Sequence, residues 1–156
     1  MDQLDARLVR LLARKADATA TELVPKMNLS IPAINKRILK LKQSSVIRRF
    51  TVLTDPQKVG KPVIAFVLVA LDHFSHAGEL HRFSEQDGDV LECYAVTGEY
   101  DFILKICAAD IEKLEDKLIR LKQHCGVVKT QTLLGLREHK FDPAPLPDEN
   151  ESEELL

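Results

Sequence analysis

The stretch Thr19–Arg49, TATELVPKMNLSIPAINKRILKLKQSSVIRR, predicts two short helices joined by a tight turn. Thr19 suits the N-cap of the first helix, because Glu22 three residues later completes a capping box. We expect that helix to end near Asn28, since Asn tolerates the left-handed conformation of a helix end. Ser30 then serves as the N-cap of a second helix. The stretch therefore predicts a helix, a turn and another helix.

The second helix has one apolar face and several polar ones. Ile34, Ile38 and Leu41 recur at the spacing of a single helical face, which is typical of packing against neighbouring helices. A short helix, a turn and a second helix form the helix-turn-helix layout. The remaining faces carry polar and basic residues, namely Asn35, Lys36, Arg37, Lys40 and Lys42.

In the helix-turn-helix layout the second helix enters the major groove and presents its N-terminal side chains to base edges. Asn pairs with adenine and Lys donates to guanine acceptors. Phosphate contacts are expected from Arg37, Lys40, Arg48 and Arg49. A solvated basic helix packed on its neighbour is the alternative interpretation. The candidate base contacts are Ser30, Ile31, Pro32, Asn35 and Lys36.

The net charge of −2 is unevenly distributed along the chain. Residues 1–60 contain 12 Lys/Arg and 5 Asp/Glu, a balance of +7, whereas residues 61–156 contain 10 and 19, a balance of −9. The basic part suits a polyanion, because phosphate contacts dominate the affinity of proteins for DNA. DNA would repel the acidic part at close range, so we expect that part to have another task.

We predict an N-terminal helix-turn-helix DNA-binding domain at residues 1–53 and a linker at residues 54–61. Asp2 caps a first helix whose leucines share one core with the two helices above. The sequence VIRRFTVL at residues 46–53 alternates as a strand does. Pro25 should shorten or kink its helix, because proline removes a hydrogen bond inside a helix.

Residues 62–140 indicate a ferredoxin-like domain with the order strand-helix-strand-strand-helix-strand. Its sheet is antiparallel with helices on one face, so the fold class is α+β. The other face needs a cover, and a second copy of the same sheet is the simplest one, which predicts a homodimer. The expected elements are strands 62–71, 90–97, 102–108 and 127–136, a helix from Ser75 to Gln86, and a helix from Asp110 to Gly126.

Residues 141–156, FDPAPLPDENESEELL, are proline-rich and then acidic, and predict a disordered tail. Cys93, Cys107 and Cys125 have no paired spacing and are expected to be reduced core residues. No apolar run approaches the ~18 residues of a membrane span, and the acidic start MDQLDARL lacks a signal-peptide pattern. We therefore expect a cytoplasmic protein with no membrane partner and no cofactor.

The first predicted domain contains the motifs Leu4-Asp5, Glu22-Leu23, Leu29-Ser30, Ile34, Arg37-Ile38, Leu41, Val46-Ile47, Phe50, Asp55-Pro56 and Gly60. The second contains TGEYDFILK at residues 97–105 and Gly126-Val127-Val128 with Thr130 and Thr132. In this order across residues 1–140, the motifs resemble the Lrp/AsnC family, the feast/famine transcription regulators. This family usually has Gly where this chain has Ser45 and an acidic residue where it has Lys42, and it often has Gly where this chain has Asn28.

The resemblance implies a transcriptional regulator that binds specific sequences of double-stranded DNA, rather than an enzyme. It also implies dimers that assemble further, commonly to octamers. It also implies a small effector, typically an amino acid, bound between second domains of neighbouring dimers. Gly98 would let backbone N–H groups approach a carboxylate, and Asp101 could accept from an ammonium group. A plain hairpin turn capped by Asp101 is the alternative. The implied effector residues are Gly98, Glu99, Tyr100, Asp101, Thr130 and Thr132.

Three other functions compete with this interpretation. A DNA-architectural protein without an effector would share the same DNA contacts. A tetrapyrrole-processing enzyme, as in the similar sirohaem decarboxylases, needs His, Tyr and Arg, whereas this region offers Tyr94 and Tyr100 beside Cys93. Metal binding would use His73, His76 and His81, but zinc sites need three or four convergent ligands. Solvated histidines are the simpler expectation, and no metal is expected.

Overall fold

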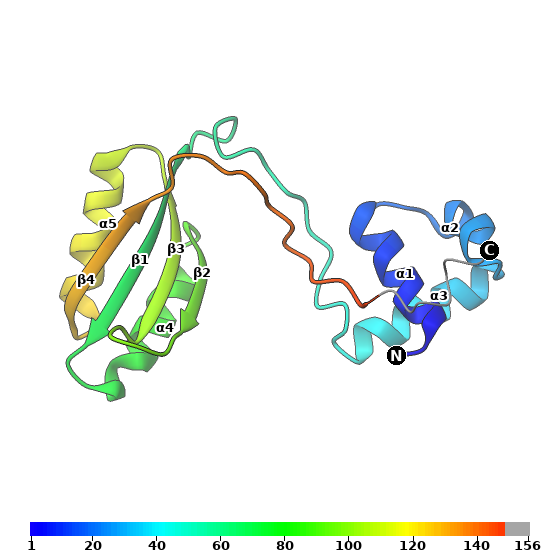
Figure 1. Ribbon diagram of the computed structural model, residues 1–156, viewed down its shortest axis with the longest axis horizontal. Helices are drawn as coiled ribbons and strands as arrows, with labels where there is room; N and C mark the ends of the chain where they lie inside the picture. The colour runs from blue at the N-terminus through cyan, green and yellow to red at the C-terminus, as the bar shows by residue number, and fades with distance from the viewer. Residues whose placement is uncertain (149–156) are drawn as a thin grey trace. The chain divides into compact units, whose positions relative to one another are not determined.

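The computed structural model describes residues 1–148 of the chain. The chain divides into two compact units (Figure 1). The first unit contains Met1–Leu53 and the described residues from Lys140 onwards, and the second contains Thr54–His139. Within residues 1–148, none of the helices has the length and apolar character that crossing a membrane requires.

The first unit is built from three helices around one small apolar core. Leu8, Leu23 and Ile34, one from each helix, are fully buried at its centre. Burying an aliphatic side chain of this size contributes about 1.5–3 kcal/mol relative to exposure, so a few residues carry much of the unit's stability. The helices are α1 (Gln3–Arg14), α2 (Ala20–Met27) and α3 (Ile31–Gln43).

Capping residues set the helix ends where the sequence predicts them. The Thr19 hydroxyl accepts from the N–H of Glu22 at 3.2 Å, and the Glu22 carboxylate accepts from the N–H of Thr19 at 2.7 Å. Ser30 caps α3, and Asn28 ends α2 in the left-handed conformation at φ 52°. Pro25 lies inside α2, which spans only 8 residues. These findings confirm the predicted helix-turn-helix.

The strand predicted at residues 46–53 is wrong for the chain that the structure describes. Val52 is 82% exposed and Leu53 61% exposed, and the segment belongs to no sheet. A strand is stable only when its backbone groups pair with another strand. Alternation along residues 46–53 therefore predicted a strand for which no local pattern supplies a partner. Ser45 makes the turn before the segment at φ 57°.

The second unit has the strand-helix-strand-strand-helix-strand order expected from the sequence. All neighbouring strands are antiparallel, in the spatial order β2-β3-β1-β4. This arrangement confirms the ferredoxin-like, α+β fold. Its elements are β1 (Val63–Leu71), a 3₁₀ helix η1 (Phe74–His76), α4 (Ala77–Gln86), β2 (Val90–Ala95), β3 (Phe102–Ala108), α5 (Ile111–His124) and β4 (Val127–Leu134).

The two faces of the sheet differ in what covers them. Helices α4 and α5 lie on one face (Figure 1), where Val67 and Val69 of β1 pack with Leu80 and Leu121. Alternate residues of a strand point to opposite faces, so the other face is apolar but not covered by these helices. We call it the open face, and its apolar side chains are Ile64, Phe66, Leu68, Tyr94, Ile103 and Leu133.

Several boundaries differ from the sequence prediction. Ser75 does not cap α4; its N–H instead donates to the ring of His73, which caps η1. Strands β2 and β4 each end two residues earlier than predicted, at Ala95 and Leu134. Asp110 caps α5 as predicted. Of the predicted tail, residues 141–148 contain no helix or strand, and residues 149–156 lie outside the described part.

Gly126 joins α5 to β4 at φ 59° and should resist substitution. A Cβ there would lie 2.0 Å from Nδ1 of His76, whose ring pairs with Asp72 at 2.6 Å. Replacement of Gly126 by Ala should lower the free energy of unfolding of the second unit by about 2 kcal/mol, since left-handed strain alone costs about 1–2 kcal/mol. Urea denaturation measures this. Gly88→Ala is the control, with no atom within 4 Å; equal stability of both variants would contradict the prediction.

Candidate nucleic-acid interface and effector site

One side of α3 is exposed and carries the predicted base contacts. Positions four apart lie on the same side of a helix, so this side continues from Asn35 to Leu39, which is 54% exposed. Sequence reasoning missed Leu39, although its spacing from Asn35 could have revealed it. Apolar side chains contact thymine methyl groups in the major groove. The predicted base contacts that the structure exposes together are Ser30, Ile31, Pro32, Asn35 and Lys36.

Arg37 lies on another side of α3, in contact with α1. Its Nη1 lies 2.7 Å from Asp2 Oδ2 and 2.6 Å from Asp5 Oδ1. The bond from Arg37 lowers the pKa of Asp2. Burial would raise the pKa of Asp5, but the bonds from Arg37 and from the N–H of Asp2 keep it below its usual value. The structure thus gives the Arg37 guanidinium two partners within the unit, where the sequence suggested a phosphate contact.

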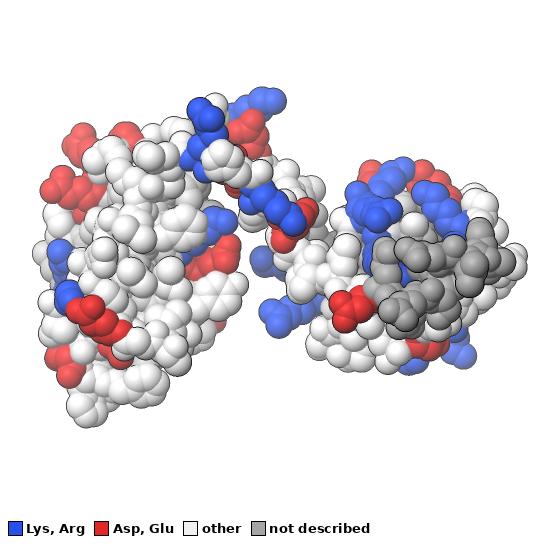
Figure 2. Space-filling view, viewed as in Figure 1, with Lys and Arg blue, Asp and Glu red and all other residues white. Residues whose placement is uncertain are grey.

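The other predicted phosphate contacts extend from the surface. Lys40 is 68% exposed although its Nζ lies 3.6 Å from Asp5 Oδ2. Residues 1–53 contain eleven Lys/Arg and four Asp/Glu, and Figure 2 shows Lys and Arg gathered on parts of the first unit and along the connecting segments. We use the name basic set for five exposed cations of α3 and the segment after it: Lys36, Lys40, Lys42, Arg48 and Arg49.

The turn between β2 and β3 is fixed to the end of β1 by Asp101. The Asp101 carboxylate accepts from the N–H of Leu71 at 2.8 Å, and the Asp101 N–H donates to the carbonyl of Val69 at 2.9 Å. Asp101 therefore has the capping role that the sequence left open. Gly98 has φ 118°, and a Cβ atom added at this position would have no other atom within 4 Å. The backbone of the turn is therefore accessible to a small molecule.

The same turn reaches across to β4 through Glu99 and Tyr100. Glu99 forms an ion pair with Lys129, which lowers the pKa of Glu99. The Tyr100 hydroxyl donates to Gln131 Oε1 at 3.2 Å, and Lys129 Nζ lies 4.9 Å from the centre of the Tyr100 ring. Sequence reasoning missed Lys129 and Gln131, because these contacts join residues about thirty positions apart and no local spacing predicts them.

Thr130 and Thr132 point to the other side of β4. Thr130 pairs with Val69 and Thr132 with Val67, and these valines are buried on the helix side of the sheet. Alternation along the strand places Lys129 on the open face. The structure thus divides the predicted effector residues between the two sides of β4, with the turn on one side and the threonine hydroxyls on the other.

The histidines of the metal alternative make separate contacts. His76 Nδ1 lies 2.6 Å from Asp72 Oδ1, and His81 Nε2 lies 3.4 Å from Glu85. His73 hydrogen-bonds within its own turn. Over residues 1–148, no three His, Cys, Asp or Glu side chains converge on a point that could hold a metal ion.

The three cysteines are free thiols. Cys107 and Cys125 are buried and Cys93 is half-buried. Burial raises the pKa of the Cys107 and Cys125 thiols, so both remain protonated and unreactive at neutral pH. Cys107 and Cys125 are buried as predicted and Cys93 packs at the edge of the core, while their reduced state stays a prediction.

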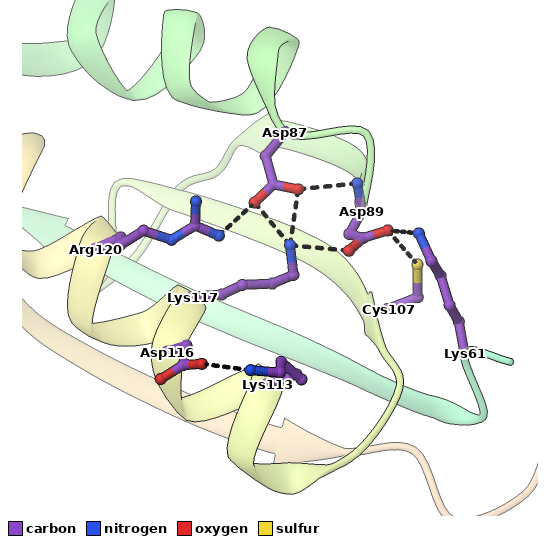
Figure 3. Close-up of polar contacts among 8 residues, drawn as sticks. All are labelled: Lys61, Asp87, Asp89, Cys107, Lys113, Asp116, Lys117 and Arg120. Carbon is purple, nitrogen blue, oxygen red and sulfur yellow. Dashed lines mark hydrogen bonds and ion pairs between the residues drawn. The ribbon is translucent and has the colours of Figure 1, made fainter.

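A cavity of about 510 Å³ lies beside α5 and contains none of the predicted effector residues. Its charges neutralise one another (Figure 3). Lys117 Nζ lies 2.8 Å from Asp87 Oδ2 and 2.9 Å from Asp89 Oδ2, and Arg120 lies 3.2 Å from Asp87. Lys61 also pairs with Asp89. Because these cations already have carboxylate partners, we do not assign the effector to this cavity.

A helix-turn-helix unit with an exposed polar helix face, followed by a ferredoxin-like unit, defines a class of two-domain DNA-binding regulators. Comparison with known families agrees with this class. Residues 1–48 match the winged helix-turn-helix DNA-binding family, and residues 64–145 match the Lrp/AsnC ligand binding domain. The chain belongs to the Lrp/AsnC family and is a DNA-binding transcriptional regulator of that type.

Individual relatives align over nearly the whole chain. HTH-type transcriptional regulator FL11 of Pyrococcus horikoshii is 31% identical over 143 residues, covering 90% of this chain and 92% of that protein. The feast or famine regulatory protein of M. tuberculosis complexed with L-methionine has a TM-score of 0.87 at 29% identity, covering 94% and 99%. A Neisseria meningitidis transcriptional regulator in an L-Met complex has a TM-score of 0.87 at 25% identity, covering 94% and 96%.

Lys117 should stabilise the second unit only while Asp87 and Asp89 are ionised. Burial would raise the pKa values of both carboxyls, but their bonds to Lys117 and neighbouring donors hold them below the usual value. This stabilisation is therefore complete above about pH 4, the unfolded pKa, and is lost as the pH falls through the lowered folded values.

Replacement of Lys117 by Met should lower the free energy of unfolding by about 3 kcal/mol at pH 7, because two largely buried carboxylates lose their main cation. The deficit should shrink toward pH 3, which denaturant titration at several pH values measures. Lys113→Met is the matched control one turn earlier, since Lys113 pairs with Asp116 on the surface and should matter little. A deficit independent of pH would contradict the ionic explanation.

Proposed function

We propose that α3 enters the major groove and reads base edges with Asn35 and Lys36, assisted by the exposed side chains at its N-terminal end. The observation that carries this proposal is that Asn35 and Lys36 are exposed while Ile34 and Leu41 of the same helix are buried in the core. In a helix-turn-helix the N-terminal part of this helix contacts the bases.

Phosphate contacts come from Lys40, Arg48 and Arg49, whose side chains are exposed. Arg37 acts differently from these residues, because its guanidinium is held by Asp2 and Asp5. It positions α3 against α1 and so sets which side of α3 faces the DNA.

The open face is the proposed dimer contact, since a second copy of the same sheet would cover its apolar side chains. Phe66 is 37% exposed, Tyr94 58% and Leu133 48%, and an exposed apolar patch of this kind marks an interaction site. Residues 54–61 link the two domains. A two-fold dimer would present two α3 helices to successive major grooves about 34 Å apart. Such dimers assemble further, and act in the cytoplasm.

The effector is an amino acid bound at the turn of residues 98–101. Two structural relatives are complexes with L-methionine, which supports this class of ligand. The accessible backbone at Gly98 suits a carboxylate, and Asp101 suits an ammonium group. An effector changes assembly only through unequal affinity for two assembled states, so we place it between second domains of neighbouring dimers. A purely architectural protein would lack this response.

Two replacements separate base reading from phosphate binding. Asn35→Ala should reduce discrimination among related operator sequences by about 1–3 kcal/mol. Arg48→Ala should instead weaken binding to all duplexes and reduce the slope of log affinity against log salt by about 0.9. Fluorescence anisotropy on duplexes selected from random DNA measures both. Arg82→Ala, an exposed arginine of the second unit, is the control. Unchanged ranking of operators by the Asn35 variant would refute its base contact.

Thermal unfolding with amino acids in excess tests the effector site. L-Methionine at about 100 times its dissociation constant should add about 2.7 kcal/mol to the stability of the native chain and raise its Tm. Asp101→Asn should abolish the rise, because the amide oxygen still accepts from the N–H of Leu71 while the charge is gone. Lys113→Met should retain it. If no amino acid raises the Tm of the wild-type chain, the architectural interpretation replaces the effector-gated one.

A further inference from the structure

Two apolar side chains of α3 lie on its exposed side instead of in the core. Ile31 is 42% exposed and Leu39 is 54% exposed, and within the described residues neither belongs to the apolar cluster of the first unit. Ile34 and Leu41 of the same helix are 0% and 2% exposed and pack with residues of α1 and α2. Core packing therefore does not account for Ile31 and Leu39.

Ile31 and Leu39 are aligned with Asn35, the residue to which we assign a base contact. Each is four residues away from Asn35, which corresponds to about 40° around the helix axis and about 6 Å along it. The three side chains thus form one row on the helix surface, apolar at both ends and polar at its centre. We call Ile31, Asn35 and Leu39 the reading row.

Charged side chains border the reading row. Lys36 and Lys40 of the basic set each follow a member of the row by one residue, about 100° around the helix, and both are exposed. Arg37 lies about 200° away from Leu39, and its guanidinium pairs with carboxylates of α1. An uncharged row beside exposed cations fits a surface that meets base edges with one part and phosphates with another.

We propose that Ile31 and Leu39 are specificity-determining residues that contact thymine methyl groups on either side of the adenine read by Asn35. This inference rests on the proposed role of α3 in base reading, and it adds the DNA sequence that the helix prefers. Among the four DNA bases only thymine presents a methyl group in the major groove, and apolar side chains recognise that group by direct contact.

The spacing of the reading row predicts how these base pairs are arranged. Successive base pairs are about 3.4 Å apart along the duplex. On a helix that follows the groove, side chains about 6 Å apart therefore lie over base pairs about two steps apart. The preferred sequence is an A·T pair with a further A·T pair about two steps to each side. Either strand can supply the methyl group, because the thymines of both strands face the major groove.

A methyl contact differs from a phosphate contact in its size and salt dependence. Removing one methyl group from an apolar contact weakens binding by about fourfold. Because no phosphate is neutralised in such a contact, the slope of log affinity against log salt should stay the same. Loss of a phosphate contact would instead reduce that slope by about 0.9.

Replacement of thymine by uracil tests the contact directly, because uracil differs from thymine only in lacking the C5-methyl group. Duplexes selected from random DNA by the full chain are scanned by replacing one thymine at a time, with affinity measured by fluorescence anisotropy. Two thymines on either side of an A·T pair should each lose about fourfold in affinity on replacement, with an unchanged salt slope.

Two variants assign each methyl contact to its residue. Leu39→Ala should abolish the uracil effect at one of the two thymines and keep it at the other, and Ile31→Ala should do the reverse. Both side chains lie outside the core, so both variants should keep the Tm of the wild-type chain. Ile119→Ala is the matched control, since Ile119 is 46% exposed on α5 of the second unit, and it should keep both uracil effects.

The possible results separate this inference from the proposed function. Selected duplexes that bind the chain but contain no thymine sensitive to uracil replacement would overturn the inference and keep the DNA-binding role. Uracil effects that persist unchanged in Leu39→Ala and Ile31→Ala would also overturn it, since other residues would then contact the methyl groups. A chain that selects no duplex at all would remove the DNA-binding role, and the inference with it.

Discussion

The ion pair between the buried carboxylate of Asp5 and the guanidinium of Arg37 fixes the geometry on which the DNA-binding unit depends. A buried charge without a partner is strongly destabilising, and Asp5 is 1% exposed, so α3 must keep Arg37 against α1. Asn35 precedes Arg37 by two residues, which places it about 200° around the helix. Holding Arg37 inward therefore turns Asn35 outward, and the stability of the unit and the orientation of its reading face follow from one contact.

The second unit uses the same kind of constraint on its helix side. Lys117, only 8% exposed, joins α5 to the turn that carries Asp87 and Asp89. Together with the apolar core, these ion pairs occupy the polar and apolar groups that the helix side presents to its interior. The open face and the turn at residues 98–101 are different, because they present apolar side chains and accessible backbone. The open face and this turn are therefore the surfaces of the second unit that remain available for contact with another molecule.

Local patterns predicted most of the fold, and contacts between distant residues account for what they missed. The caps at Thr19 and Ser30 and the order of six elements follow from neighbouring residues, and the structure has them. The strand at residues 46–53 was wrong because a strand depends on a partner that no local pattern supplies. In the candidate site, exposure of Asn35 and Lys36 followed from helical spacing. The ion pairs of Arg37 and the contacts of the turn with β4 join residues about thirty positions apart, beyond the reach of periodicity.

The affinity of a single dimer for DNA decides whether the proposed assembly of dimers can control occupancy. A single dimer that bound DNA very tightly would occupy its site whether or not dimers assembled further. When the affinity of each dimer for DNA is modest, occupancy depends on several dimers holding adjacent sites at once, where linked binding multiplies weak affinities. A ligand that shifts the assembly equilibrium then changes occupancy without touching the DNA contacts. On this view a modest affinity of each dimer for DNA is the condition under which an effector at residues 98–101 can control the regulator.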